Sequence, residues 1–349
     1  MSVSAKNPHL EELGQFLKAR RSELSPTALG LPPGDPGTRR VSGLRRQEVA
    51  AQAAISHDYY SRIEQGRLAP SPPVLDALAH TLRLTPVERA YVEGLARQAD
   101  RRTSPRRRPA PVRPQIQRLL DQLTLTPAFV VGKYLDFIAW NPLAAALLID
   151  IDKMAPHERN YVRMLFADPR MKDFYDDWEG MARTGVALLR MQVVDNPSDP
   201  RLANLVGELS VGYPLFRQWW ASRHVASQNF GSKTIHHPEL GELTLDWDSF
   251  YWSGDPDQHI TVWSPAPGSP SEEKLRILSW WSSNQRLPTT SPPDETDHDR
   301  DCRMVVAVSD EPLTDGFAGS GGGVGLAPRH RRRRRAADHR DRRARCPLQ

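Results

Sequence analysis

Apolar residues recur at helical spacing through the first hundred positions of the chain. Leu13, Phe16 and Leu17 share one face of a stretch over residues 10–21, which predicts an amphipathic helix. A Gly- and Pro-rich segment over residues 25–43 interrupts this pattern and is expected to be a loop. Four further short helices are expected over residues 45–53, over residues 57–65, after Ser71-Pro72 and after Thr85-Pro86. These segments predict an all-helical domain over residues 1–100.

The pattern changes after Pro114, where short apolar strands join longer helical stretches. Strands are expected over residues 128–132, 135–140, 234–237, 242–245 and 259–263, with helices over 116–123, 144–148, 155–194, 200–223 and from Ser269 onward. Strands at both ends with helices between them predict an α/β domain over residues 115–284. The Arg- and Pro-rich residues 101–114 predict an extended linker, and the polar residues 285–349 predict a disordered tail.

Charge is divided unevenly between the two predicted domains. Residues 1–113 hold 19 Lys and Arg against 11 Asp and Glu, a net of +8, whereas residues 114–284 hold 15 against 21, a net of −6. A basic first domain is typical of contact with nucleic acid, although a solvated basic surface would have the same composition. The two cysteines, Cys302 and Cys346, lie outside any metal-ligand spacing, so a reducing cytoplasm is expected. No apolar run approaches the roughly 18 residues of a membrane helix.

Residues 45–66 have the spacing of a helix-turn-helix. Ala50 supplies the small residue where the two helices of such a motif touch, and Ser56 can cap the second helix through its side-chain oxygen. The inward apolar positions are Val49, Ala53, Ile55, Tyr60 and Ile63. Ala54 stands at the turn position that glycine usually occupies, which costs roughly 1 kcal/mol if the backbone there is left-handed. The alternative is an ordinary helical hairpin with a solvated outer face.

The outward positions of this motif are candidates for contact with DNA. Arg62 can form a bidentate contact to guanine, and Asp58 can accept from cytosine or orient Arg62. Arg45 and Arg46 stand at the start of the first helix of the motif, where phosphates are expected. The complete predicted DNA-binding set is Arg45, Arg46, Gln47, Ser56, His57, Asp58, Tyr59, Ser61 and Arg62.

Several stretches resemble the MmyB-like branch of the XRE family of bacterial transcription regulators. In the first domain these are Gly43-Leu44-Arg45-Arg46-Gln47-Glu48-Val49-Ala50, residues 59–67 and Pro70-Ser71-Pro72; in the second they are residues 129–132, 139–144, 158–160, 237–245 and 268–271. The resemblance runs from about Glu11 to Leu278. It implies a helix-turn-helix domain followed by a ligand-binding domain with a PAS-like fold. It also implies that Glu64 pairs with an arginine of the first helix, Arg20 or Arg21.

The second predicted domain is rich in large aromatic residues, which suit the wall of a small-molecule pocket. The expected wall is Phe129, Ile138, Trp140, Leu165, Phe166, Trp178, Phe216 and Trp219, with Asn141, Asn160, Arg163 and Arg190 as polar anchors. An arginine among these anchors could clamp a carboxylate. Such a wall suits a small apolar or lipid-like ligand. The alternative is that these aromatics simply fill a core.

The sequence therefore predicts a sequence-specific DNA-binding transcription regulator whose activity a small ligand modulates. One short helix reads few base pairs, so a homodimer on double-stranded DNA is expected. We find no phosphate-binding glycine loop, nucleophile elbow or metal-ligand cluster in the sequence, so no enzymatic activity, metal or cofactor is expected. Two alternatives remain open: an enzyme carrying a targeting helix-turn-helix, and an antitoxin-like interaction protein.

Overall fold

The computed structural model describes residues 7–32, 43–100, 111–148, 151–252, 255 and 257–284. The expected tail over residues 285–349 and most of the expected linker lie outside these residues, as does part of the expected loop over residues 25–43. Within the described ranges, no helix is both long enough and apolar enough to cross a bilayer.

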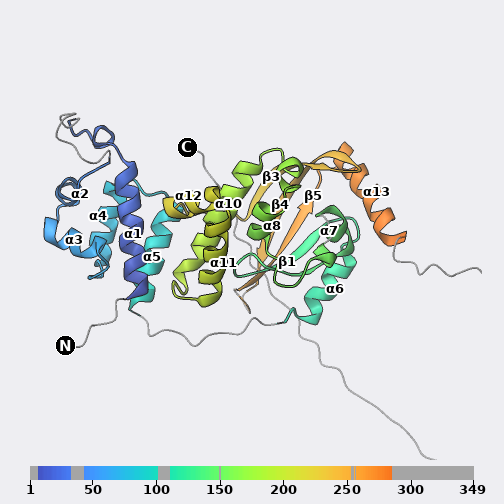
Figure 1. Ribbon diagram of the computed structural model, residues 1–349, viewed down its shortest axis with the longest axis horizontal. Helices are drawn as coiled ribbons and strands as arrows, with labels where there is room; N and C mark the ends of the chain where they lie inside the picture. The colour runs from blue at the N-terminus through green and yellow to red at the C-terminus, as the bar shows by residue number, and fades with distance from the viewer. Residues whose placement is uncertain are drawn as a thin grey trace, which may run out of the picture. The chain divides into compact units, whose positions relative to one another are not determined.

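The N-terminal part of the described chain is helical (Figure 1). Its elements are α1 (Pro8–Glu23), the 3-10 helix η1 (Pro26–Leu29), α2 (Arg46–Gln52), α3 (His57–Glu64), α4 (Pro72–Thr81) and α5 (Pro86–Ala99). Thr85 starts α5 with the capping box that the sequence predicts, because its hydroxyl accepts from the backbone N–H of Glu88 while Glu88 accepts from that of Thr85.

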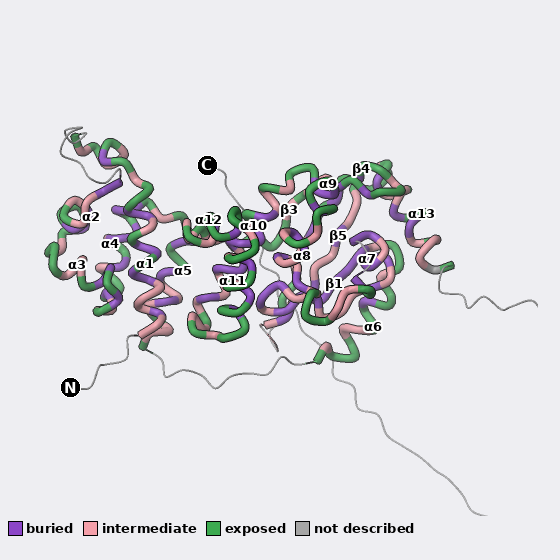
Figure 2. Tube along the Cα trace, viewed as in Figure 1, coloured by how far each residue is buried: buried purple, intermediate pink, exposed green. Residues whose placement is uncertain are grey.

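A single apolar core joins these helices. Leu13, Phe16 and Leu17 of α1 are fully buried, as the helical spacing predicts, and they pack with residues of α3, α4 and α5. The rings of Phe16 and Tyr91 lie 5.2 Å apart between centroids. In Figure 2 the buried stripe of α1 continues along its length, while α3 presents an exposed outer side. The first helix therefore lies at the centre of the helical part, in contact with both α3 and α5.

The C-terminal part contains an antiparallel five-stranded sheet in the order β2-β1-β5-β4-β3. Its strands are β1 (Ala128–Gly132), β2 (Phe137–Trp140), β3 (Phe230–His237), β4 (Gly241–Tyr251) and β5 (Gln258–Ser264). The predicted strand over residues 128–132 is confirmed, and β3 and β4 form the predicted hairpin around residues 238–241. The strand predicted over 242–245 is longer, because its alternation of polar and aromatic residues continues to Tyr251 and pairs with β5.

Helices cover both faces of this sheet. They are α6 (Pro114–Gln122), α7 (Pro142–Leu147), η2 (Ile151–Lys153), α8 (Tyr161–Ala167), α9 (Met171–Phe174), α10 (Trp178–Met191), η3 (Gln192–Val194), α11 (Pro200–Gly212), α12 (Pro214–Ser222) and α13 (Pro270–Asn284). Leu120 of α6 packs on Val130 and Ile260 on one face. The opposite face, which carries Phe129 and Trp263, joins the main core with the other helices. The predicted α/β architecture is confirmed.

Candidate functional site

Helices α2 and α3 form the predicted helix-turn-helix pair. The hydroxyl of Ser56 accepts from the backbone N–H of Tyr59 at 3.1 Å, so Ser56 caps α3 as the sequence predicts. Ala50 is 2% exposed, which fits the requirement for a small residue between the helices. The backbone of Ala54 has φ of 54°, so the turn is left-handed although the residue has a Cβ. Local sequence thus specifies the cap, whereas the turn forms against the backbone preference of alanine.

The outer face of this pair carries the predicted DNA-binding residues. Gln47, His57, Asp58 and Arg62 are exposed, and Tyr59 is half-buried. Arg45 is the residue before α2, and Ser61 is half-buried on α3. The N-terminal turn of α3 and its outward side are therefore accessible, as docking in a major groove requires.

Arg46, which the sequence predicts to contact a phosphate, also has a structural contact that its position in the sequence did not reveal. Its Nε donates to Oε1 of Glu64 at 2.8 Å, although its side chain remains 40% exposed. Arg21 binds the same carboxylate through Nε at 2.8 Å and Nη2 at 3.0 Å. Burial alone would raise the pKa of Glu64, but these two guanidinium groups outweigh it and hold that pKa below its ordinary value.

The structure shows which of the two candidate arginines of α1 pairs with Glu64. Arg21 is the partner, whereas Arg20 donates to Oε1 of Glu88 at 2.9 Å. Arg21 also donates to the carbonyl of Leu44, just before α2. Glu64 therefore ties α1, α2 and α3 together from a buried position, as a structural residue and not as a DNA contact.

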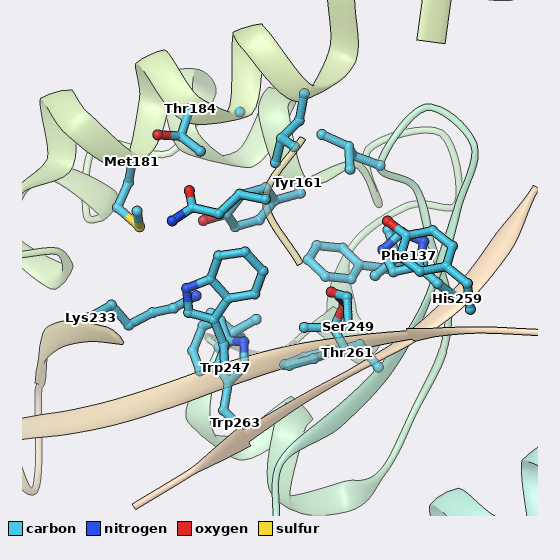
Figure 3. A pocket seen from close by; sticks show the side chains of 18 of the residues that line it. Phe137, Tyr161, Met181, Thr184, Lys233, Trp247, Ser249, His259, Thr261 and Trp263 are labelled. Carbon is cyan, nitrogen blue, oxygen red and sulfur yellow. Dashed lines mark hydrogen bonds between the residues drawn. The ribbon is translucent and has the colours of Figure 1, made fainter. Parts of the chain in front are cut away.

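A pocket lies between the sheet and helix α10 in the C-terminal part (Figure 3). Met181 and Thr184 project into it from α10, and Trp247 and Trp263 project from β4 and β5. Its remaining wall is mostly apolar or aromatic: Phe129, Val131, Leu135, Phe137, Leu148, Tyr161, Gly185, Leu188 and Tyr251. Gly231 leaves room for this wall, because a Cβ there would lie 2.8 Å from the indole nitrogen of Trp247.

Lys233 is the cationic side chain of this pocket wall. Its ammonium lies 3.8 Å from the ring centroid of Trp263 and 5.3 Å from that of Trp247. Among the residues that the structure describes, none forms a hydrogen bond or ion pair with this ammonium. Removal from water lowers the pKa of Lys233 from 10.5 to about 7. An acidic group in the pocket would supply the missing partner.

Other polar groups lie farther along the same wall. The hydroxyls of Ser249 and Thr261 are 2.9 Å apart on neighbouring strands, and both residues line the pocket. His259 stacks on Tyr251 with 4.7 Å between ring centroids. Burial lowers the pKa of His259 to about 4, so this imidazole is neutral near pH 7. The pocket therefore combines an aromatic body with one cation and a few hydrogen-bonding groups.

Of the predicted ligand-binding residues, Phe129 lines this pocket and the others lie elsewhere. Phe166, Trp178, Phe216 and Trp219 do come together, but they pack against one another across α8, α10 and α12. The indole N–H of Trp178 donates to the carbonyl of Leu165 at 2.8 Å. These aromatics fill a core between helices, which was the alternative the sequence left open.

The predicted polar anchors have structural partners. Asn141 caps α7 by accepting from Ala144 and donates to the carbonyls of Leu123 and Thr126. Asn160 caps α8 and donates to the carbonyl of Tyr134. These two amides serve the backbone, which explains their burial.

Four further predicted residues also lie outside the pocket wall. Arg163 forms an ion pair with Glu208, and Arg190 faces the helical part, where it contacts Glu12. Ile138 packs with the α6 side of the sheet. The indole N–H of Trp140 donates to Asp152 at 2.8 Å.

The pocket residues that the sequence reasoning missed have a detectable signal. Trp247, Ser249 and Tyr251 alternate along β4, so they share one face of the sheet. Met181, Thr184 and Leu188 recur at helical spacing on α10. Together, these two periodicities indicate one face of β4 and one face of α10 that could form opposite walls of a pocket. Aromatic content alone led instead to the residues of the core between helices.

Two family models match separate parts of the chain. Residues 12–92 match the family model of a helix-turn-helix domain. Residues 112–278 match that of the MmyB-like transcription regulator ligand binding domain. No curated protein is similar enough in sequence to count as a relative.

Proposed function

The chain is an MmyB-like helix-turn-helix transcription regulator, and we propose that its pocket binds an apolar molecule bearing an acidic group that controls sequence-specific DNA binding. The coarse function follows from its two domains, which are those of a ligand-modulated, DNA-binding regulator. The chemistry of the ligand is the further step. The observation that carries it is Lys233, a cation without a carboxylate partner among the described residues in an aromatic pocket.

The pocket wall supports an apolar ligand body. Aromatic and aliphatic side chains from the sheet and α10 surround the space, and burial of apolar ligand surface against them is favourable. An acidic group of the ligand beside Lys233 would form a charge-assisted hydrogen bond with its ammonium. Ser249 and Thr261 could donate to or accept from other polar atoms of the ligand.

The DNA-binding half of the proposal assigns base reading to the outward side of α3. Arg62, Asp58 and His57 are exposed there, and Arg62 can reach guanine in a major groove. We propose a homodimer that places two such helices on half-sites about 34 Å apart, since one helix contacts too few bases for specificity.

The aromatic sulfonate 8-anilinonaphthalene-1-sulfonate tests the ligand chemistry, because it stays anionic and its fluorescence rises in apolar sites. We expect Lys233→Met to weaken its binding by about tenfold or more, through loss of the charge-assisted contact. Binding to the unaltered protein should also weaken as the pH rises above about 7. Lys233 is protonated below its pKa of about 7, and above that value it must take up a proton to meet the sulfonate.

Lys274→Met is the matched control for this titration. Lys274 lies on α13, where its ammonium donates to the carbonyl of Glu242 outside the pocket wall. The proposal expects Lys274→Met to leave the sulfonate affinity and its pH profile unchanged. Equal binding by the Lys233→Met protein at pH 6.5 would contradict the assignment of an acidic ligand.

A further inference from the structure

Two sides of helix α10 make different contacts. One face lines the pocket through Met181, Thr184 and Leu188. Near the end of the helix, Arg190 lies on a different side, and its side chain is 1% exposed. Its guanidinium lies 3.7 Å from the ring centroid of Trp220 and donates to the Trp220 carbonyl at 2.5 Å. The helix that forms a pocket wall therefore ends in a fixed, buried cation.

Arg190 belongs to a largely buried group of side chains that joins this helix to the helical domain. We call Glu12, Tyr91, Arg190 and Arg223 the Glu12 cluster. Oε1 of Glu12 accepts from Nη1 of Arg190 at 2.9 Å and from the hydroxyl of Tyr91 at 2.9 Å. Oε2 of Glu12 lies 2.5 Å from Nη1 of Arg223, which follows α12. One carboxylate of α1 thus binds two cations of the ligand-binding domain.

The cluster resists separation because Arg190 is buried and the side chains of Glu12 and Arg223 are only 13% and 18% exposed. Burial would raise the pKa of Glu12, but Arg190 and Arg223 outweigh that effect and lower it. Moving α10 away from Glu12 would take from the buried Arg190 its carboxylate partner, and an uncompensated buried charge is strongly unfavourable. A displacement of the end of α10 is therefore expected to carry α1 with it.

Apolar packing reinforces the same contact. Met191, Val194 and Val225 pack against the core of the helical domain. A Cβ on Gly94 of α5 would lie 2.7 Å from Val194, so the two surfaces are in close contact there.

Within the helical domain, α1 is held firmly against the recognition helix α3. A Cβ on Gly14 would lie 2.4 Å from the carbonyl oxygen of Glu64, so the two backbones approach closely at this point. Arg21, also on α1, binds the Glu64 carboxylate from the same side. The helix-turn-helix is therefore expected to follow α1 as one body, without a change in its internal fold.

We propose that the Glu12 cluster transmits occupancy of the pocket to the helix-turn-helix, so that a ligand reorients the DNA-binding domain instead of refolding it. This inference rests on the proposed function in taking the pocket as the regulatory site. It adds the route: from the pocket face of α10, through Arg190 to Glu12, and along α1 to α3.

A double-mutant cycle on the full chain tests this route without any ligand. Thr184→Phe fills the pocket from α10 and so imitates occupancy. We expect it to change the Kd for a duplex selected from random DNA by about fivefold or more, the lower range for allosteric coupling. In a Glu12→Gln background, which removes the charge from the cluster, the same Thr184→Phe change should alter the Kd by less than about twofold.

Glu93→Gln is the matched background, because Glu93 pairs with Arg89 on the surface of α5. Thr184→Phe should keep its full effect there. An equal effect of Thr184→Phe in the Glu12→Gln and Glu93→Gln backgrounds would overturn the route, as would no effect in the unaltered protein. If Glu12→Gln does not fold, Arg190→Gln, which breaks the same contact from α10, serves in the cycle under the same criterion. Failure of the sulfonate to bind would instead count against the proposed ligand and leave this cycle unaffected.

Discussion

Arg62 and Glu64 lie two positions apart on α3 and have opposite surroundings. Arg62 is exposed on the outward side, whereas Glu64 is buried and bound by Arg21 and Arg46. Both are charged, so composition does not distinguish them. The helical period does, because it directs Glu64 with Ile63 and Tyr60 toward the core and leaves Arg62 outside.

Replacing Arg62 tests the base-reading role at the level of one residue. Arg62→Ala is expected to cost about 1–3 kcal/mol at the preferred DNA site and to relax the preference at the base it reads. Binding should be measured on a panel of duplexes with single-base changes. Arg45→Ala is the control, since a phosphate contact should weaken binding to all sequences alike. An unchanged base preference in Arg62→Ala would remove this residue from base reading.

The turn between α2 and α3 can be tested at the level of the element. Ala54 has a left-handed backbone with φ of 54°, which glycine adopts without steric strain. Ala54→Gly is therefore expected to raise the free energy of unfolding by about 0.5–1 kcal/mol, after allowing for the greater entropy of glycine in the unfolded chain. Thermal unfolding followed by circular dichroism measures this difference.

Ala51→Gly is the paired comparison for this turn. Ala51 is exposed on α2, where glycine is disfavoured by about 1 kcal/mol. The two glycine variants should shift the melting temperature in opposite directions. A loss of stability in Ala54→Gly as large as that in Ala51→Gly would show that the turn is not strained.

The helices and strands could be predicted from the sequence largely because their signals are local. Ser56, Thr85 and Asn141 each stand before a helix that their side chains cap. The pocket could not be predicted in the same way, because it depends on which face of α10 meets which face of the sheet. Lys233 lines the pocket, whereas the aromatics of α8, α10 and α12 pack against one another between helices. The local sequence around these residues does not indicate this difference, because it depends on how distant elements pack.

On the scale of the whole molecule, two buried charge groups connect the parts that the function requires. Glu64 unites α1, α2 and α3, and Glu12 joins α1 to the end of α10. The same helix thus contacts both the recognition helix and the domain that contains the pocket. A ligand can shift DNA affinity only as far as it binds two arrangements of the protein differently. We place that difference at the pocket, and we propose that the Glu12 cluster couples it to the helix-turn-helix.

The most direct test of this account is the DNA affinity of the full chain with its pocket empty and filled. A duplex selected from random DNA would be titrated by fluorescence anisotropy with and without saturating 8-anilinonaphthalene-1-sulfonate, using a dye outside the sulfonate's emission. We predict that the sulfonate changes the Kd of the unaltered protein by about fivefold or more and has little effect on Lys233→Met. An unchanged Kd while the sulfonate occupies the pocket would contradict ligand control of DNA binding through this site.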